Sequence, residues 1–166
     1  MPRIAGDVPS RQLDPERLGD HLDRLYRAAL GLCGSAADAD DLVQETFVQV
    51  LRKPRLLRSD DDLGYLMRVL RNTFHSRHRT ESRRPRTTEL EDELAAAPGP
   101  AADDVVASRE VLAAVAALPE PFRETVAAVD LAGLSYGEAA RALGCRQGTI
   151  MSRLYRGREQ VAEALR

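Results

Sequence analysis

The segment from 134 to 158, LSYGEAARALGCRQGTIMSRLYRGR, predicts two short helices joined by a tight turn. Ser135 and Glu138 are spaced as a capping box, in which each side chain binds an amide left open at the start of a helix. Gly144 can adopt the left-handed backbone that ends a helix and turns the chain. We expect the second helix to begin near Gln147, so the segment has the form of a helix-turn-helix.

The second of these helices is suited to DNA. Ile150 and Leu154 are four residues apart and are expected to face inward, which leaves the polar side chains on the other faces. A helix in the major groove meets base edges and phosphates with such groups. A plain helical hairpin is the alternative interpretation, because short motifs of this kind also occur without DNA binding. The candidate DNA-binding side chains are Gln147, Thr149, Ser152, Arg153 and Arg156.

Composition favours a small all-helical protein. The 166 residues are 43% hydrophobic but only 4% aromatic, and cores of Leu, Val and Ala suit helices better than sheets. No apolar run is long enough to span a membrane and the first residues lack an apolar signal core, so we expect no membrane insertion and a cytoplasmic location. Cys33 and Cys145 are far apart in sequence and are interpreted as buried thiols or turn residues, not as a disulfide.

The net charge of −2 conceals two segments of opposite charge. Residues 65–86 contain seven arginines and one acid, whereas residues 87–108 contain six acids and no base. A solvated helix face would need compensating acids among the arginines. The first segment is therefore interpreted as a surface for a nucleic acid, which the second segment would repel.

Three helical patterns fill the amino-terminal half. One apolar stripe runs from Leu18 to Leu32 and ends at Gly34. A second helix follows, with Ser35 or Asp38 as its cap, an acidic first turn and an apolar face that continues to Pro54. Residues 53–62 read as a loop. Ser59 and Asp62 are spaced as another capping box before a third apolar stripe, which comprises Leu63, Leu66, Met67, Leu70 and Phe74.

Periodicity stops between residues 82 and 102, where prolines and Gly99 indicate a linker. Four further helices are expected beyond it, and the second of them begins at Pro121 and closes at Gly133. The chain is thus predicted to be all-α, with one domain at 14–81, a flexible acidic linker at 82–103 and a second domain at 104–166. Such a linker leads us to expect that the two domains move independently in the free protein.

Three segments together resemble a known family. They are DADDLVQETFVQVLR (38–52), LGYLMRVLRNTFHSRHR (63–79) with SRRPR (82–86), and ALPEPFRETVAAVDLAGLSYGEAARALGCRQGTIMSRLYRGREQV (117–161). They are similar, in this order, to the core segments of an extracytoplasmic-function (ECF) sigma factor of the sigma-70 family, the small bacterial initiation subunit of RNA polymerase. The family usually has a Trp where this chain has Tyr65, and often a Ser or Pro where Arg146 stands. An arginine at position 146 is expected to cap the following helix more weakly and to offer an additional positive charge to a DNA phosphate.

The resemblance implies partners and roles. It implies core RNA polymerase and promoter DNA as partners, with an anti-sigma factor as the usual regulator. The acidic second helix would dock on a coiled coil of the beta-prime subunit through Asp40, Asp41, Gln44, Glu45 and Gln49. The arginine-rich third helix would read the minus-ten promoter element, with Asn72 near a flipped base, through Arg68, Arg71, Asn72, His75, Arg77 and Arg79. The minus-thirty-five element would be read by Arg146, Gln147, Thr149, Ser152, Arg153, Arg156 and Arg158.

Other classes of function have less support. The best candidates for a metal or catalytic site are His75 with His78 and the two cysteines, yet zinc needs three or four ligands and the arginines around the histidines oppose a cation. We therefore expect no catalysis, no cofactor and no metal. A stronger rival is an autonomous helix-turn-helix regulator, which binds operator DNA as a dimer without polymerase.

Overall fold

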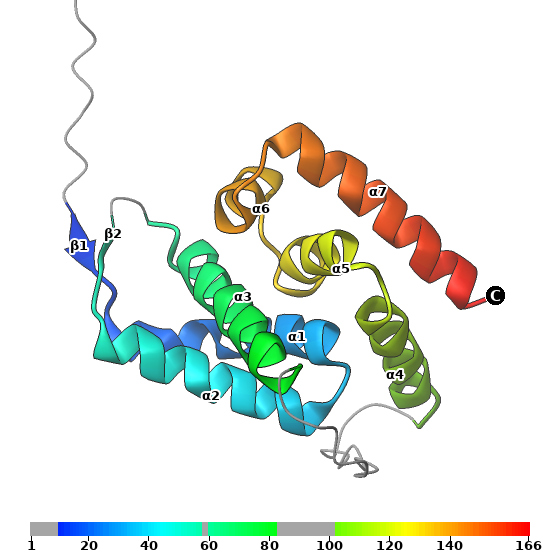
Figure 1. The fold of residues 1–166 in the computed structure, drawn as a ribbon, viewed down its shortest axis with the longest axis horizontal. Coiled ribbons are helices and arrows are strands. Elements are labelled where there is room, and N and C mark those ends of the chain that lie inside the picture. The colour runs from blue at the N-terminus through cyan, green and yellow to red at the C-terminus, as the bar shows by residue number, and fades with distance from the viewer. Residues whose placement is uncertain (1–9, 58–59, 83–101) are drawn as a thin grey trace, which may run out of the picture.

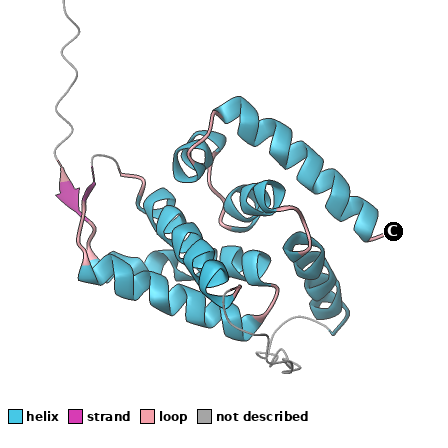
Figure 2. Ribbon diagram, viewed as in Figure 1, coloured by secondary structure: helices cyan, strands magenta, loops and turns pink. Residues whose placement is uncertain are grey.

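The described part of the chain is almost entirely helical (Figure 2). A computed structural model describes residues 10–57, 60–82 and 102–166. Within them, extended structure is limited to β1 (Arg11–Gln12) and β2 (Leu56–Leu57), which pair antiparallel with Arg11 opposite Leu57. The predicted all-α fold is confirmed, and the short β pairing lies partly in the segment that we expected to be a loop.

The amino-terminal half contains a 3-10 helix and three α-helices: η1 (Pro15–His21), α1 (Leu22–Cys33), α2 (Ala36–Arg52) and α3 (Asp62–Glu81). Gly34 ends α1 with a left-handed backbone at φ 74°, and Ser35, one of the two expected caps, accepts a hydrogen bond from the Asp38 amide at 3.2 Å. Ser59, the first residue of the capping box expected before α3, lies outside the described residues. Asp61 is the cap instead, and its carboxylate accepts from the Gly64 amide at 2.8 Å.

The carboxyl-terminal half contains α4 (Ala102–Ala116), α5 (Glu120–Val126), the π-helical turn η2 (Ala127–Leu131), α6 (Tyr136–Leu143) and α7 (Gln147–Ala164). Pro121 occupies the first turn of α5, as expected, because that position needs no amide donor. The turn at Gly133 (φ 75°) then leads into α6. Figure 1 shows α6 and α7 side by side at one end of the molecule.

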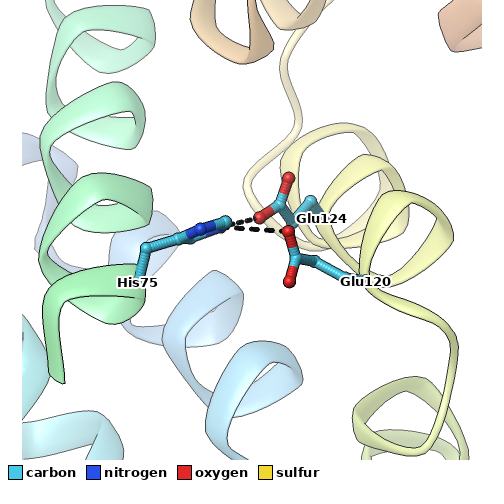
Figure 3. Close-up of side chains that lie close together, drawn as sticks. All are labelled: His75, Glu120 and Glu124. Atoms are coloured by element: carbon cyan, nitrogen blue, oxygen red, sulfur yellow. Dashed lines mark hydrogen bonds and ion pairs between the residues drawn. The ribbon is translucent and has the colours of Figure 1, made fainter. Parts of the chain in front are cut away.

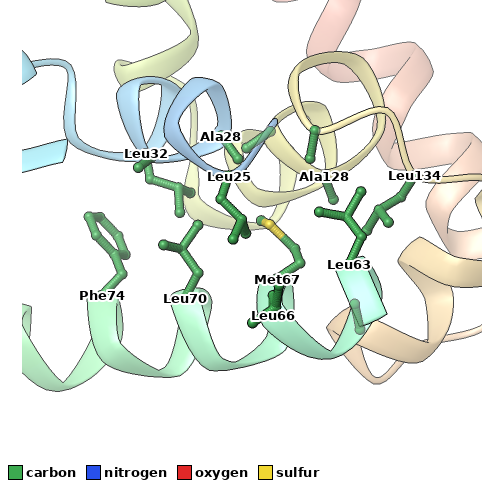
Figure 4. Close-up of a cluster of buried hydrophobic side chains, with 14 of the residues drawn as sticks. Leu25, Ala28, Leu32, Leu63, Leu66, Met67, Leu70, Phe74, Ala128 and Leu134 are labelled. Atoms are coloured by element: carbon green, nitrogen blue, oxygen red, sulfur yellow. The ribbon is translucent and has the colours of Figure 1, made fainter. Parts of the chain in front are cut away.

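The two halves of the chain pack against each other and share a hydrophobic core. Leu25 and Ala28 of α1 lie between the apolar side chains of α3 and Ala128 of η2 (Figure 4). This packing differs from the expected independence of the two domains. The predicted linker lies mostly outside the described residues, since only its ends at 82 and 102–103 are covered.

Helix α1 makes this packing possible because it is buried on more than one face. Leu25, Ala28, Ala29 and Leu32 form one stripe whose side chains are all at most 2% exposed, and Gly31 is buried beside this stripe. At Gly31 the side chain of Leu131 lies so close that an added Cβ would collide with it. Small residues let two backbones approach closely, and here Gly31 lets η2 pack directly against α1.

Leu25 offers a test of this shared core. Leu25→Ala removes a fully buried side chain from the centre of both halves and is expected to lower the free energy of unfolding by about 2–5 kcal/mol. The measurement is urea denaturation followed by circular dichroism. Leu22→Ala on the same helix is the matched control, because Leu22 is 42% exposed and should cost roughly 1 kcal/mol or less. Equal losses in the two variants would contradict the central position of Leu25.

Candidate nucleic-acid interface

The helix-turn-helix forms as the sequence predicts. The Ser135 hydroxyl accepts from the Glu138 amide at 3.2 Å, and the Glu138 carboxylate accepts from the Ser135 amide at 2.7 Å. Gly144 ends α6 with φ 66°, and α7 begins at Gln147. The capping box therefore fixes the start of α6, and the glycine sets the angle at which α7 leaves it.

Helix α7 presents a polar surface along its first half. Ile150 and Leu154 are buried, as expected, which fixes the rotation of the helix. Ser152 donates to the carbonyl of Thr149 at 3.1 Å. Of the candidate DNA-binding residues on this helix and its cap, Thr149 and Arg153 are partly buried, while the exposed ones are Arg146, Gln147, Ser152, Arg156 and Arg158.

Arg158 of α7 is bound to a carboxylate of another element. Its guanidinium makes a two-pronged ion pair with Asp130 of η2, at 2.6 Å and 3.0 Å. Hydrogen bonding to this carboxylate raises the pKa of Arg158 above its usual value. The pair ties the middle of α7 to η2, so the geometry gives Arg158 a structural role that the sequence pattern did not indicate.

Helix α3 carries the candidate minus-ten residues, but they point in different directions. Asn72 and Arg79 are exposed, and Arg79 contacts the hydroxyl of Ser76 on its own helix at 3.4 Å. Arg68, Arg71 and His75 lie on the face directed at the second half of the chain. Arg68 donates to the carbonyl of Arg141 at 2.9 Å, which joins α3 to α6.

A buried carboxylate of α5 joins two of these side chains. Glu124 is 3% exposed, and one of its oxygens accepts from Arg71 Nε at 2.8 Å while the other is paired with His75 Nε2 (Figure 3). Glu120, one turn earlier on α5, lies 3.6 Å from the same His75 nitrogen. A buried carboxylate without partners would be costly, and Arg71 and His75 provide them.

Within the described ranges, His75, Glu120 and Glu124 form a group that could hold a metal ion. One ligand atom each from His75, Glu120 and Glu124 lies within 4.8 Å of the others. The histidine pair considered from the sequence is therefore not the relevant one. Arg71 already occupies one oxygen of Glu124, and a guanidinium so close opposes a divalent cation. The arrangement is best described as an ion-pair network between α3 and α5.

The candidate polymerase-docking residues line an open face of α2. All five are exposed, and the apolar side chains of Val48 and Leu51 lie beside them at 43% and 52% exposure. Arg77 of α3 approaches two of the acids, Asp41 at 3.9 Å and Glu45 at 3.8 Å. The side chain of Arg77 therefore points toward α2 and not toward the face of α3 that was predicted to bind DNA. The five docking candidates are Asp40, Asp41, Gln44, Glu45 and Gln49.

Sequence reasoning missed the residues that connect the two halves. Glu124 lies off the apolar stripe of α5, and nothing in its neighbourhood indicates a charge partner more than 40 residues away. Arg24 of α1 was missed for the same reason. It donates to the carbonyls of Ala132 and Gly133 at 2.6 Å and 2.7 Å. Such contacts depend on the packing of the two halves. The linker sequence indicated independent domains and therefore did not predict this packing.

None of the helices in the described ranges combines the length and apolar character required to cross a membrane. The described surfaces are an acidic helix with exposed Val48 and Leu51, an arginine-rich helix and a helix-turn-helix.

Comparison with known proteins agrees with this geometry. Residues 18–84 match the Sigma-70 region 2 family and residues 108–161 match the Sigma-70, region 4 family. The chain is 36% identical to the ECF RNA polymerase sigma factor SigE of Mycolicibacterium smegmatis, over 96% of this chain and 64% of that protein. It is also 36% identical to EcfG of Rhodopseudomonas palustris, over 82% of this chain and 76% of EcfG. SigM of Mycobacterium tuberculosis is 33% identical, over 98% of this chain and 80% of SigM.

Solved structures have the same fold. The sigma factor RpoE in complex with the anti-sigma factor NepR, from Bartonella quintana, aligns with a TM-score of 0.69 at 26% identity, over 90% of this chain and 94% of that one. CnrH in complex with the cytosolic domain of CnrY aligns with a TM-score of 0.61 at 22% identity, over 90% of this chain and 85% of the CnrH chain. The chain spans about two thirds of the length of SigE and more of the other relatives.

These matches show that the chain is a sigma-70 family protein that contains regions 2 and 4. The chain belongs to the ECF sigma factors of that family.

Cys33 is the last residue of α1, and Cys145 lies in the turn between α6 and α7. Both are free thiols and partly buried. Burial is the main cause that raises the pKa of Cys33 to about 12, and the nearby carboxylate of Asp38 adds to it. A thiol with so high a pKa stays protonated at neutral pH, and only the thiolate is a good nucleophile. We therefore expect Cys33 to be a weak nucleophile in the folded protein.

Thiol labelling checks this property. In the Cys145→Ala variant the remaining thiol is Cys33, and we expect Ellman's reagent to react with it far more slowly at pH 8 than after unfolding in urea. A pKa of about 12 leaves roughly one thiol in ten thousand ionised at pH 8. The rate should rise with pH in the folded protein. Fast labelling at pH 8 without denaturant would show that the thiol is neither buried nor shifted.

Proposed function

We propose that this protein is a transcription initiation factor that binds core RNA polymerase and directs it to promoters with specific minus-ten and minus-thirty-five elements. Membership of the ECF sigma factors is the observation that carries the proposal. The chain also has the separate surfaces that this activity needs: an exposed acidic helix, an arginine-rich helix and a helix-turn-helix. It is a binding protein without a catalytic role of its own. Family membership disfavours the autonomous operator-binding regulator.

The docking surface is assigned to α2. Its acidic residues are exposed and its apolar residues Val48 and Leu51 are also open to solvent, so the helix offers both charge and apolar area to a basic partner. We assign the beta-prime coiled coil of polymerase to this surface. Since Arg77 already approaches Asp41 and Glu45, Asp40 is the acid that the partner can reach with least internal competition.

The minus-thirty-five element is assigned to the first half of α7. Gln147, Thr149 and Ser152 can exchange hydrogen bonds with base edges, while Arg153 and Arg156 can hold phosphates on either side. Arg146 precedes the helix without capping it and offers a further cation. Arg158 is also assigned to this surface, but its ion pair with Asp130 already balances its charge, so it is expected to contribute less to phosphate binding than the other arginines.

The minus-ten element is assigned to α3 with Asn72 at its centre. Asn72 is exposed, and an Asn amide can both donate to and accept from a base edge. We assign Arg68, Arg71, Arg77, Arg79 and His75 to the same element, as candidates for contacts with its phosphates. In this structure Arg71 and His75 are bound to Glu124, and Arg77 faces α2. An anti-sigma factor that regulates the chain would have to cover these surfaces or prevent docking on α2.

Charge reversal on α2 tests the docking assignment and the proposed function together. Asp40→Lys with Asp41→Lys should weaken binding to core polymerase by about tenfold or more, chiefly through a slower on-rate, because two attractive charges become repulsive. Biolayer interferometry with immobilised core enzyme gives both rates. Asp20→Lys with Asp23→Lys makes the same charge change on η1 and α1, and should bind as wild type. Equal affinity of both double variants would remove the docking assignment, and no binding by the wild-type chain would remove the function.

Asn72 is tested at the step where the strands open. Asn72→Ala should leave closed-complex formation nearly unchanged while reducing strand opening, because a flipped base would lose its hydrogen-bond partner. Permanganate footprinting of the holoenzyme on a cognate promoter measures the unpaired thymines. Ser76→Ala, at an exposed position one turn further along α3, is the matched control and should melt the promoter normally. Normal melting by Asn72→Ala would contradict the assignment.

A further inference from the structure

Helix α7 carries two large apolar side chains that its packing leaves in solvent. Tyr155 is 69% exposed and Met151 is 54% exposed, whereas Ile150 and Leu154 of the same helix are buried in the core. A single exposed apolar residue is ordinary in a folded protein. Side chains four positions apart on a helix are neighbours, however, so Met151 and Tyr155 form one apolar row. Tyr136 of α6 lines the same surface groove.

A polar row runs beside this apolar row. Ser152 and Arg156 each follow one of the two apolar residues in sequence, about 100° further around the helix, and both are exposed. The hydroxyl of Ser152 donates to the carbonyl of Thr149 at 3.1 Å, which leaves its oxygen able to accept a hydrogen bond. The exposed surface of α7 therefore presents apolar contacts, a hydrogen-bond acceptor and a cation side by side.

An A·T base pair offers complementary groups in the major groove. Thymine presents its C5-methyl group there, and adenine presents an amino group that donates hydrogen bonds. Apolar side chains can contact the methyl group, while a hydroxyl oxygen accepts from the amino group. The Cβ atoms of residues four apart on a helix are separated by about 6 Å, and bases stack at about 3.4 Å. The apolar row is thus long enough to meet about two neighbouring base pairs.

The position of the row favours DNA over a protein as its occupant. Both apolar residues lie in the first half of α7, at residues 147–155, and this part of the second helix of a helix-turn-helix enters the major groove. Exposed cations flank the row at Arg146 and Arg156, which suits a polyanion. The row is also continuous with Ser152, which is already assigned to base edges.

We propose that Met151 and Tyr155 recognise thymine methyl groups in the minus-thirty-five element and so favour promoters with thymine at the contacted positions. The inference rests on the proposed function, since it takes α7 as the minus-thirty-five surface. It adds a second kind of recognition to that surface. Hydrogen bonds from the polar side chains distinguish donors from acceptors on base edges, whereas the apolar row distinguishes thymine by its methyl group.

Replacement of thymine by deoxyuridine tests the proposal, because it removes only the methyl group. Holoenzyme formed from the full-length chain and core polymerase first selects duplexes from a promoter library with a randomised minus-thirty-five region. Each thymine of a selected element is then replaced in turn, and the affinity is measured by fluorescence anisotropy. Affinity should fall by about fourfold at a contacted thymine, which is the contribution of one buried methyl group. Thymines between the two promoter elements are the controls and should tolerate the replacement.

Variants connect the effect to the apolar row. Met151→Ala should bind the selected promoter more weakly and lose the response to deoxyuridine at one position, because the methyl group then has no partner. Tyr155→Ala should lose the response at a neighbouring position. Met151→Leu keeps an apolar side chain of similar size and should retain the response. Leu165→Ala is the matched control, since it shortens an apolar side chain of 43% exposure just after α7 and should bind as wild type.

Three results would overturn the proposal. In the first, no thymine of the selected element responds to deoxyuridine. In the second, the response persists unchanged in both alanine variants, each of which is verified as folded by circular dichroism melting. In the third, Met151→Ala weakens binding to core polymerase and leaves binding to DNA intact, which would assign the row to a protein partner.

The selection step reports on the proposed function separately. If the wild-type holoenzyme selects a minus-thirty-five sequence that does not respond to deoxyuridine, the function stands and only the methyl contacts are wrong. If the holoenzyme enriches no sequence at this position, the assignment of α7 to the minus-thirty-five element is wrong, and the inference loses its basis.

Discussion

The arrangement of the whole molecule depends on the burial of α1 on more than one face. Leu25, Ala28 and Leu32 contribute to a single core that also receives side chains from α3 and from η2. Apolar area removed from water is the main favourable term in such packing, and the larger cluster spans both halves of the chain. A smaller cluster, formed by Val115, Leu118, Val126 and Leu154, lies within the carboxyl-terminal half. The ion pairs of Arg71, His75 and Arg24 form at the edges of this apolar contact. They exist because the core brings the two halves together.

Much of the fold could be predicted from local signals in the sequence. The capping box at Ser135, the left-handed glycines at 34 and 144, and the start of α7 at Gln147 are all confirmed. Each of these depends on a few adjacent residues, which is why the sequence reveals them. The start of α3 was not predicted in this way, because the spacing of Ser59 and Asp62 indicated a capping box, whereas the cap in the structure is Asp61.

The contacts between the halves could not be predicted in the same way. Glu124 and Arg71 are distant in sequence, and each has an ordinary explanation as an exposed charged residue. Periodicity showed that α1 is amphipathic, but it did not show that its alanines and Gly31 form a second contact surface. For the candidate DNA surfaces, the sequence indicated the helices correctly. It did not indicate that Arg77, Arg158 and Arg71 have carboxylate partners within the chain.

The small residues of α1 also limit how this protein can be recombined with its relatives. Ala28 and Gly31 accept η2 only because neither side chain extends far from the helix, and a Cβ at Gly31 would meet Leu131. A chimera that joins residues of the first half to the second half of another sigma factor needs surfaces that match at these two positions. Regions 2 and 4 of this chain are therefore not freely interchangeable modules, because their fit to each other is encoded in one helix of the first and one turn of the second.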